Sequence, residues 1–105
     1  MKTLQLNIVT PNTRVYRGDV RSVTVPAWKG DMGVLPGHAP YLSLLVPGRV
    51  TARIPARQAE GGPRLLTFTV TGGCVEVLPD RVTIMADSAA PSDGGRRDQP
   101  VPQPA

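Results

Sequence analysis

Few side chains in this sequence are capable of covalent chemistry. The chain has one histidine, His38, and one cysteine, Cys74, in 105 residues. A cysteine and a histidine can form a nucleophilic pair where a fold brings them together, but Cys74 stands beside the expected start of a strand, as an ordinary structural cysteine would. A single cysteine forms no internal disulfide, and this pair alone cannot supply a Cys/His metal cluster. We therefore predict no catalytic residue and no metal site.

The carboxylates and the paired glycines do not form a reactive motif either. Glu76 and Asp80 are separated by a turn, and no other group converges on them to make an acid/base pair. Gly72 and Gly73 precede a strand pattern, whereas a phosphate-binding glycine loop leads into a helix. The two glycines are instead typical of a bulge or of a close backbone approach. We predict no nucleotide site, no cofactor and no small-molecule ligand.

The segment Gly30–Pro40 reads GDMGVLPGHAP and has unusual backbone chemistry. Gly33 and Gly37 can adopt positive φ at little cost, whereas Pro36 and Pro40 fix φ and restrict the residues before them. The pattern predicts a rigid, shaped loop. Turn chemistry alone makes it a corner between two strands.

Composition restricts the class of protein. The chain has room for one domain, and its 40% hydrophobic and 4% aromatic residues require a core of Val, Leu, Ile and Ala. No run approaches the roughly 18 apolar residues of a membrane span, and no signal peptide is recognisable. We expect a soluble protein that stays in a reducing cytoplasm. The net charge of +4 comes from scattered basic residues, which favour a solvated face or a polar protein partner and give no support to nucleic-acid binding.

Apolar residues alternate with polar ones along most of the chain, as they do in half-buried strands. No 3.6-residue period persists, so no helix is predicted, and Tyr41–Val46 is a continuous apolar run that predicts a strand buried on both faces. Residues 56–63 form an expected polar hairpin loop. The resulting fold is all-β, a flattened sandwich or barrel. The strands are expected at Leu4–Val9, Val15–Tyr16, Val20–Val25, Tyr41–Val46, Arg49–Ile54, Leu66–Val70, Val75–Val77 and Val82–Ala86.

An ordered series of segments resembles one family. The Gly30–Pro40 loop, Leu4–Val9, Pro47-Gly48, Thr71–Val77 and Val82–Asp87 follow the order and spacing of the epsilon subunit of F-type ATP synthases, called delta in mitochondria. The resemblance covers residues 3–89 and implies a sandwich of about ten strands. It also implies a non-catalytic rotor subunit of the central stalk, which links the gamma subunit to the c ring and couples proton or sodium flow to ATP synthesis. Such a subunit is peripheral, at the cytoplasmic face of the cell membrane of a bacterium.

The end of the sequence departs from that family. We expect one domain over residues 1–89 and a disordered tail over residues 90–105, whose Pro, Gly and polar residues cannot bury enough surface to fold. Most epsilon subunits continue into two helices that restrain ATP hydrolysis and in some members bind ATP. Because no helical hairpin is predicted here, those regulatory roles are not carried over.

The resemblance assigns roles to two groups of residues. Asp31 matches an acidic position that faces the polar loops of the c subunits, although a solvated turn carboxylate is an alternative. Its neighbours Trp28, Lys29 and Met32 complete the expected c-ring interface, with Trp28 taken as an interface anchor rather than a core anchor.

His38 matches a position that meets gamma, and the expected gamma interface is His38, Pro40 and Tyr41. The alternative for His38 is a hydrogen bond within its own loop.

A stand-alone sandwich that binds a protein or a carbohydrate is the alternative function. Carbohydrate binding usually relies on exposed aromatic side chains, and with Phe68 expected in the core only Trp28, Tyr16 and Tyr41 are available.

Overall fold

Ten strands and no helix make up the described part of the chain. The computed structural model describes residues 2–55 and 65–92. The predicted all-β sandwich of about ten strands is confirmed. The strands are β1 (Leu4–Val9), β2 (Arg14–Val20), β3 (Ser22–Ala27), β4 (Gly30–Val34), β5 (Tyr41–Leu45), β6 (Gly48–Arg53), β7 (Leu65–Val70), β8 (Gly73–Leu78), β9 (Arg81–Ala86) and β10 (Ala89–Pro91).

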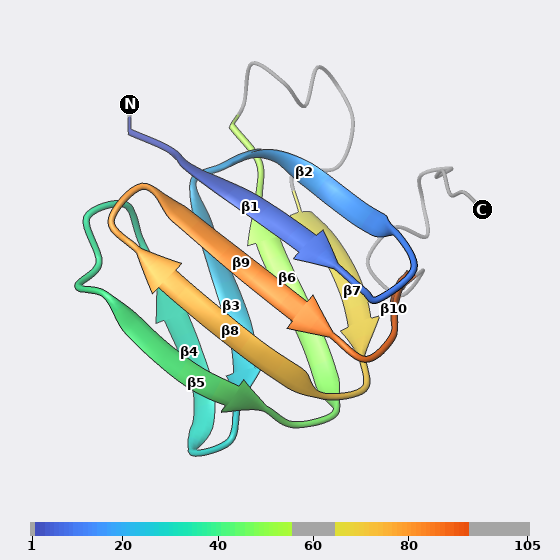
Figure 1. Cartoon of the computed structure of the whole chain (residues 1–105). Helices are drawn as coiled ribbons and strands as arrows, with labels where there is room; N and C mark the ends of the chain where they lie inside the picture. Colours follow the sequence, from blue (N-terminus) through green and yellow to red (C-terminus); the bar gives the residue numbers. More distant parts are fainter. Residues whose placement is uncertain (1, 56–64, 93–105) are drawn as a thin grey trace.

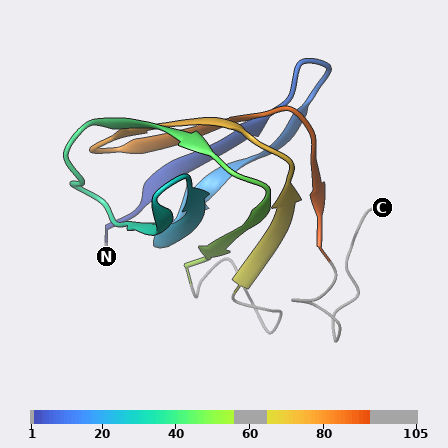
Figure 2. The same ribbon diagram turned by 90° about the horizontal axis from the view of Figure 1, so that it is seen from below.

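The strands form one hydrogen-bonded path that folds back over itself. The order is β10-β7-β6-β3-β5-β8-β9-β1-β2, with β4 paired to β3 outside this path. β1 and β9 pair in parallel, and the other described pairs are antiparallel. Figures 1 and 2 show two layers, with β5, β8, β9, β1 and β2 in one and β4, β3, β6, β7 and β10 in the other. We call these the front layer and the back layer.

The core lies between the two layers and consists almost entirely of aliphatic side chains. Strand residues alternate between the faces of a sheet, so every second residue of β1, β8 and β9 points inward and is fully buried. Phe68 is the aromatic member of this core, and Tyr16 packs against it with ring centroids 5.5 Å apart. Close packing of such side chains makes a stiff body. The largest fully buried side chains are Leu4, Leu6, Ile8, Ile84, Val20, Val23, Val25, Val34, Val50, Val70, Val75 and Val77.

The first half of the predicted rigid loop is a strand. Residues Gly30–Val34 form β4 and pair along their length with β3, so the loop proper begins at Leu35. Gly33 lies opposite Thr24 within this ladder, and the positive φ values fall instead on Gly30 (125°) and Gly37 (88°). Gly33 therefore does not use the positive φ that glycine permits, because ladder pairing with β3 holds it in the sheet.

β2 is longer than the sequence predicted. It runs through Gly18 without a break, because Gly18 pairs with Leu6 of β1. The chain turns at Arg21, so the segment expected as one strand over Val20–Val25 is divided between β2 and β3.

The predicted domain boundary and tail fall only partly within the described residues. β10 pairs Ala89 with Val70 and Pro91 with Phe68, so the sheet extends to Pro91, past the boundary predicted at residue 89. The rest of the predicted tail and the predicted hairpin loop over residues 56–63 lie outside the described residues.

The half-buried phenol of Tyr16 predicts a change of stability at alkaline pH. Burial raises the pKa of Tyr16 above its ordinary value of 10.0, and the negative charge of Asp19 raises it further. The unfolded chain ionises first as the pH rises, so the stability that neutral Tyr16 contributes is complete below about pH 10 and is lost as the pH passes the folded pKa. Urea unfolding from about pH 9 to about pH 11 should show a steeper loss for the natural chain than for Tyr16→Phe, which keeps the ring. Equal slopes would contradict the prediction.

Candidate functional site

The turn between β3 and β4 presents the first predicted group of residues. Trp28 is 62% exposed, and Lys29 and Asp31 are exposed beside it. Met32 is only partly exposed and packs against the core, so it supports the turn from behind. The backbone N–H of Trp28 donates to the carbonyl oxygen of Leu44 at 3.0 Å, which ties the turn to β5. A large indole is therefore held out to solvent on a short, anchored hairpin.

The second predicted group lies in the loop between β4 and β5. The His38 ring nitrogen Nδ1 lies 2.7 Å from the carbonyl oxygen of Ala39, so the imidazole is hydrogen-bonded within its own loop. The N–H of Gly37 donates to the carbonyl oxygen of Pro79 at 2.8 Å, which anchors the loop to the turn between β8 and β9. Pro40 and Tyr41 are exposed. The loop is thus held by hydrogen bonds both within itself and to the turn between β8 and β9.

The structure does not bring the two predicted groups together. β4 begins at Gly30 beside Trp28 and ends at Val34, before the loop that carries His38. Figure 1 shows the two connections at opposite ends of β4. The two groups therefore lie on separate parts of the surface.

His38 and Cys74 are also kept apart. Tyr41, which follows the His38 loop, pairs with Val77, whereas Cys74 pairs with Leu44 at the other end of β5. Within the described ranges no group of three His, Cys, Asp or Glu side chains could hold a metal ion. His38 and Cys74 therefore do not form a nucleophile with an adjacent base.

The prediction that β5 is buried on both faces was wrong. Leu42 and Leu44 are 68% and 63% exposed, while Leu45 is buried. A continuous apolar run is expected both for a strand that is covered on two faces and for a strand that has one exposed apolar face. The sequence pattern therefore could not distinguish these two cases. The exposed leucines lie on the outer face of the front layer.

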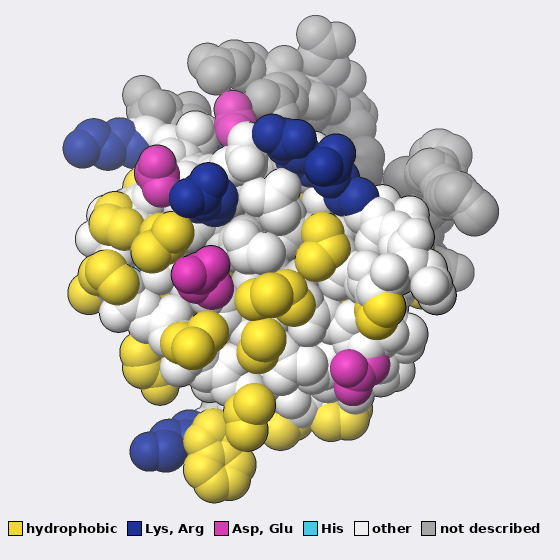
Figure 3. Space-filling model, in the orientation of Figure 1, with side chains coloured by type: hydrophobic (Ala, Val, Ile, Leu, Met, Phe, Trp, Pro, Cys, Tyr) yellow, Lys and Arg dark blue, Asp and Glu magenta, His cyan; other side chains and the backbone are white. Residues whose placement is uncertain are grey.

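These leucines begin an apolar row that crosses the front layer. Cross-strand pairing places Leu44 beside Cys74, Cys74 beside Met85, and Met85 beside Val9. We call Val9, Leu42, Leu44, Cys74 and Met85 the apolar strip. Figure 3 shows hydrophobic side chains gathered over β5, β8 and β9, with most Lys and Arg near the top of the view and in the lowest loop.

The outer face of the back layer has a different chemistry. Thr24, Thr51 and Thr67 lie side by side across β3, β6 and β7, and Arg49 and Arg53 are exposed on the same face of β6. A contiguous exposed apolar surface marks an interaction site, whereas a threonine and arginine face is suited to water. Only the front layer therefore offers an apolar docking face among the described strands.

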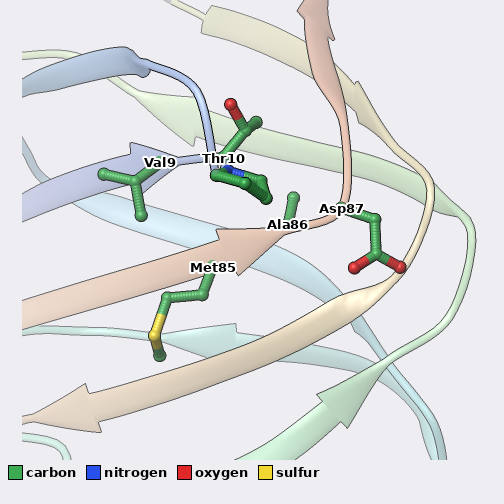
Figure 4. Close-up of a pocket in the computed structure, with 6 residues that line it drawn as sticks. Val9, Thr10, Met85, Ala86 and Asp87 are labelled. Atoms are coloured by element: carbon green, nitrogen blue, oxygen red, sulfur yellow. The ribbon is translucent and has the colours of Figure 1, made fainter.

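A shallow hollow of about 330 Å³ lies where the strip meets the ends of β1 and β9. Figure 4 shows Val9 and Met85 on one side of the hollow and the Asp87 carboxylate on the other. Its walls are mainly apolar, with one exposed charge. The lining residues are Val9, Thr10, Pro11, Met85, Ala86 and Asp87.

Comparison with known proteins decides the family. A family described as "ATP synthase, Delta/Epsilon chain, beta-sandwich domain" matches residues 3–92. The chain belongs to this ATP synthase delta/epsilon family. The ATP synthase epsilon chains of Bacillus subtilis (strain 168) and Alkalilimnicola ehrlichii are 43% and 40% identical to it, over 90% and 86% of this chain. The alignments cover 66% and 60% of those two relatives, so the chain spans about two thirds or less of their length.

Solved structures agree with the delta/epsilon fold. A chain of the Euglena gracilis mitochondrial ATP synthase, in a structure of its OSCP, F1 and c-ring, matches with a TM-score of 0.73 and 25% identity, over 87% of this chain and 54% of the other. A chain from the central stalk and c-ring of the Tetrahymena thermophila enzyme matches with a TM-score of 0.66 and 18% identity, over 86% of this chain and 69% of the other, which supports the fold alone.

No helix of the described part is long and apolar enough to cross a membrane.

Sequence reasoning placed Trp28 and Asp31 at the surface, where the structure has them, but missed the exposure of Leu42, Leu44 and Met85. Met85 had a usable signal, since it alternates with the buried Ile84 and Ala86 and must face outward. The leucines had none, because the face of β5 that turns toward the core is set by its pairing with β8, which is distant in sequence.

Proposed function

We propose that this chain is a non-catalytic central-stalk subunit of an F-type ATP synthase, which links the gamma subunit to the c ring and couples proton or sodium flow to ATP synthesis. The match of residues 3–92 to the delta/epsilon sandwich domain carries this proposal. Rotation of the ring can be passed on only by a stiff body with two firm attachments. The closely packed aliphatic core provides the stiffness, and the two surfaces at the ends of β4 provide the two attachments.

The gamma subunit is proposed to cover the front layer beside the His38 loop. His38, Pro40 and Tyr41 lead directly into β5, whose Leu42 and Leu44 begin the apolar strip. Burial of exposed leucines is worth about 1.5–3 kcal/mol for each fully covered side chain. Burial of the strip thus favours binding, and the loop that carries His38 fixes where gamma docks.

The c ring is proposed to meet the β3–β4 turn through Trp28, Lys29, Asp31 and Met32. Asp31 offers a carboxylate to basic groups, Trp28 is the exposed anchor, and Met32 holds the turn against the core. In a bacterium this arrangement places the subunit at the cytoplasmic face of the cell membrane, bound there through the complex.

Binding to gamma tests the proposal. Purified chain and purified gamma subunit from the same source should form a stable one-to-one complex in size-exclusion chromatography and calorimetry. Absence of any complex, with both proteins folded by circular dichroism, would refute the assignment.

Asp31→Arg is expected to weaken coupling without unfolding the domain. The side chain is exposed, so its replacement should change the free energy of unfolding by about 0.5 kcal/mol or less, whereas like charges at the c-ring contact should weaken docking about tenfold. ATP-driven ion pumping in vesicles carrying the reconstituted complex measures the effect, with Asp19→Arg as a control on β2. Normal pumping by Asp31→Arg would remove Asp31 from the interface.

A further inference from the structure

Two carboxylates flank the row from Leu44 to Val9, and one of them, Glu76, pairs with Leu42 of the apolar strip. Glu76 lies on β8 two residues beyond Cys74, and Asp87 follows Met85 at the same spacing just past the end of β9. Since residues two apart in an extended chain share a face, both carboxylates stand on the outer side of the front layer, and both are exposed. Figure 3 shows one acidic side chain among the hydrophobic side chains of this face and another near its lower right edge.

Neither carboxylate has a charged partner among the described residues, since no ion pair joins it to another described side chain. Arg81 is the cation on the three strands β5, β8 and β9. It lies at the opposite end of β9 from Asp87, about 20 Å away at 3.3 Å per residue. It is two positions before Thr83, the residue opposite Glu76, and is thus a diagonal neighbour of Glu76 that forms no ion pair with it. Glu76 and Asp87 therefore remain available to an incoming surface.

The spacing of the two charges is set by the sheet register. Glu76 pairs with Thr83, and Asp87 follows Thr83 by four positions along the chain. The two carboxylates are thus about 13 Å apart along the strand direction. The row from Leu44 to Val9 crosses the sheet between them.

We propose that the strip selects a partner surface in which an apolar ridge is flanked by two basic side chains about 13 Å apart. This inference rests on the proposed function, in which the partner is the gamma subunit, and it assigns to Glu76 and Asp87 the role of specificity determinants. Charges at the rim of an interface steer encounter and reject mismatched partners more than they add affinity. A partner without these cations would cover two carboxylates and leave them unpaired, which is costly.

The hollow beside Asp87 indicates what kind of basic side chain the partner would place against that carboxylate. Its walls of Val9, Pro11 and Met85 are apolar and its rim carries the carboxylate. Lysine and arginine have an apolar stem and a charged head. Such a side chain would pack its stem on Met85 and direct its head to Asp87.

The test compares binding of purified gamma to the full chain and to charge variants. Glu76→Gln with Asp87→Asn should slow association about tenfold and should remove most of the dependence of the association rate on salt. Glu76→Lys with Asp87→Lys should weaken binding by about 100-fold. Asp80→Asn, an exposed carboxylate in the turn between β8 and β9, is the matched control and should bind as the natural chain does. Urea unfolding of each variant checks that the fold is retained.

The outcomes separate this inference from the proposed function. Tight gamma binding by the natural chain, with the same rates and salt dependence in the double neutral variant, would overturn the charge pattern and leave the function standing. No gamma binding by the natural chain would overturn both. A salt-sensitive dimer of the natural chain in sedimentation, lost in the lysine variant, would show that the strip serves a second copy instead and would also overturn the proposal.

Discussion

Replacement of Gly73 by alanine should destabilise the sandwich by about 3 kcal/mol or more. Gly73 has a φ of 129°, a conformation that side-chain-bearing residues rarely adopt. A Cβ added at this position would also clash with the backbone carbonyl oxygen of Met85 and lie 2.9 Å from the Cα of Ala86. Both obstacles are backbone atoms in the ladder between β8 and β9, so relief of the clash would require these strands to separate.

Gly30→Ala is the matched control for this effect. Gly30 has nearly the same φ, 125°, but a Cβ there would meet no atom within 4 Å. It should therefore cost only the backbone strain, about 1–2 kcal/mol. Thermal and urea unfolding of the two variants measure the difference, and for a domain of this size each kcal/mol lowers Tm by roughly 4–8 °C. Equal losses in the two variants would show that the close approach at Gly73 does not matter.

The close approach at Gly73 was one of two alternatives that the sequence left open for the paired glycines, the other being a bulge. The atom that Gly73 approaches is a carbonyl oxygen on β9. The position of β9 is set by pairing with β1 and β8 rather than by neighbours in the sequence. Strands with regular alternation, such as β1 and β9, were predictable because each one buries a single face against the core. β4 was not, because GDMGV contains two glycines and its pairing with β3 overrides that local signal.

The candidate surfaces were predictable only in part, for a related reason. Trp28 lies in the turn before Gly30 and Asp31 directly follows that glycine at the start of β4, and turns lie at the surface. Leu42 and Leu44 are leucines in an apolar run, and a face that awaits a partner has the composition of a core. The separation of the two surfaces at opposite ends of β4 depends on strand pairing, which no local pattern contains. The same holds for the flanking positions of Glu76 and Asp87, which become neighbours of the strip only through the register of β8 with β9.

Leu44→Asp is expected to weaken binding to gamma by about 100-fold, equivalent to about 2.7 kcal/mol. Leu44 is 63% exposed and stands at the β5 end of the apolar row, beside Cys74. A carboxylate there would be buried without a partner on binding, and loss of an anchoring side chain from an interface can cost about 2 kcal/mol or more. In the free chain the aspartate remains in water, so the free energy of unfolding should fall by no more than about 1 kcal/mol, the span of strand propensities.

Leu65→Asp provides the comparison for Leu44→Asp. Leu65 is 42% exposed on β7, and its neighbour across the ladder is Arg53, so it lies on the polar outer face of the back layer. The same substitution there removes an exposed leucine and adds the same charge, but outside the proposed gamma surface. Calorimetric titration of gamma into the natural chain and both variants should therefore show the natural affinity for Leu65→Asp and a large loss for Leu44→Asp. A large loss in both would mean that gamma recognises overall charge, and a loss in Leu65→Asp alone would place gamma on the back layer.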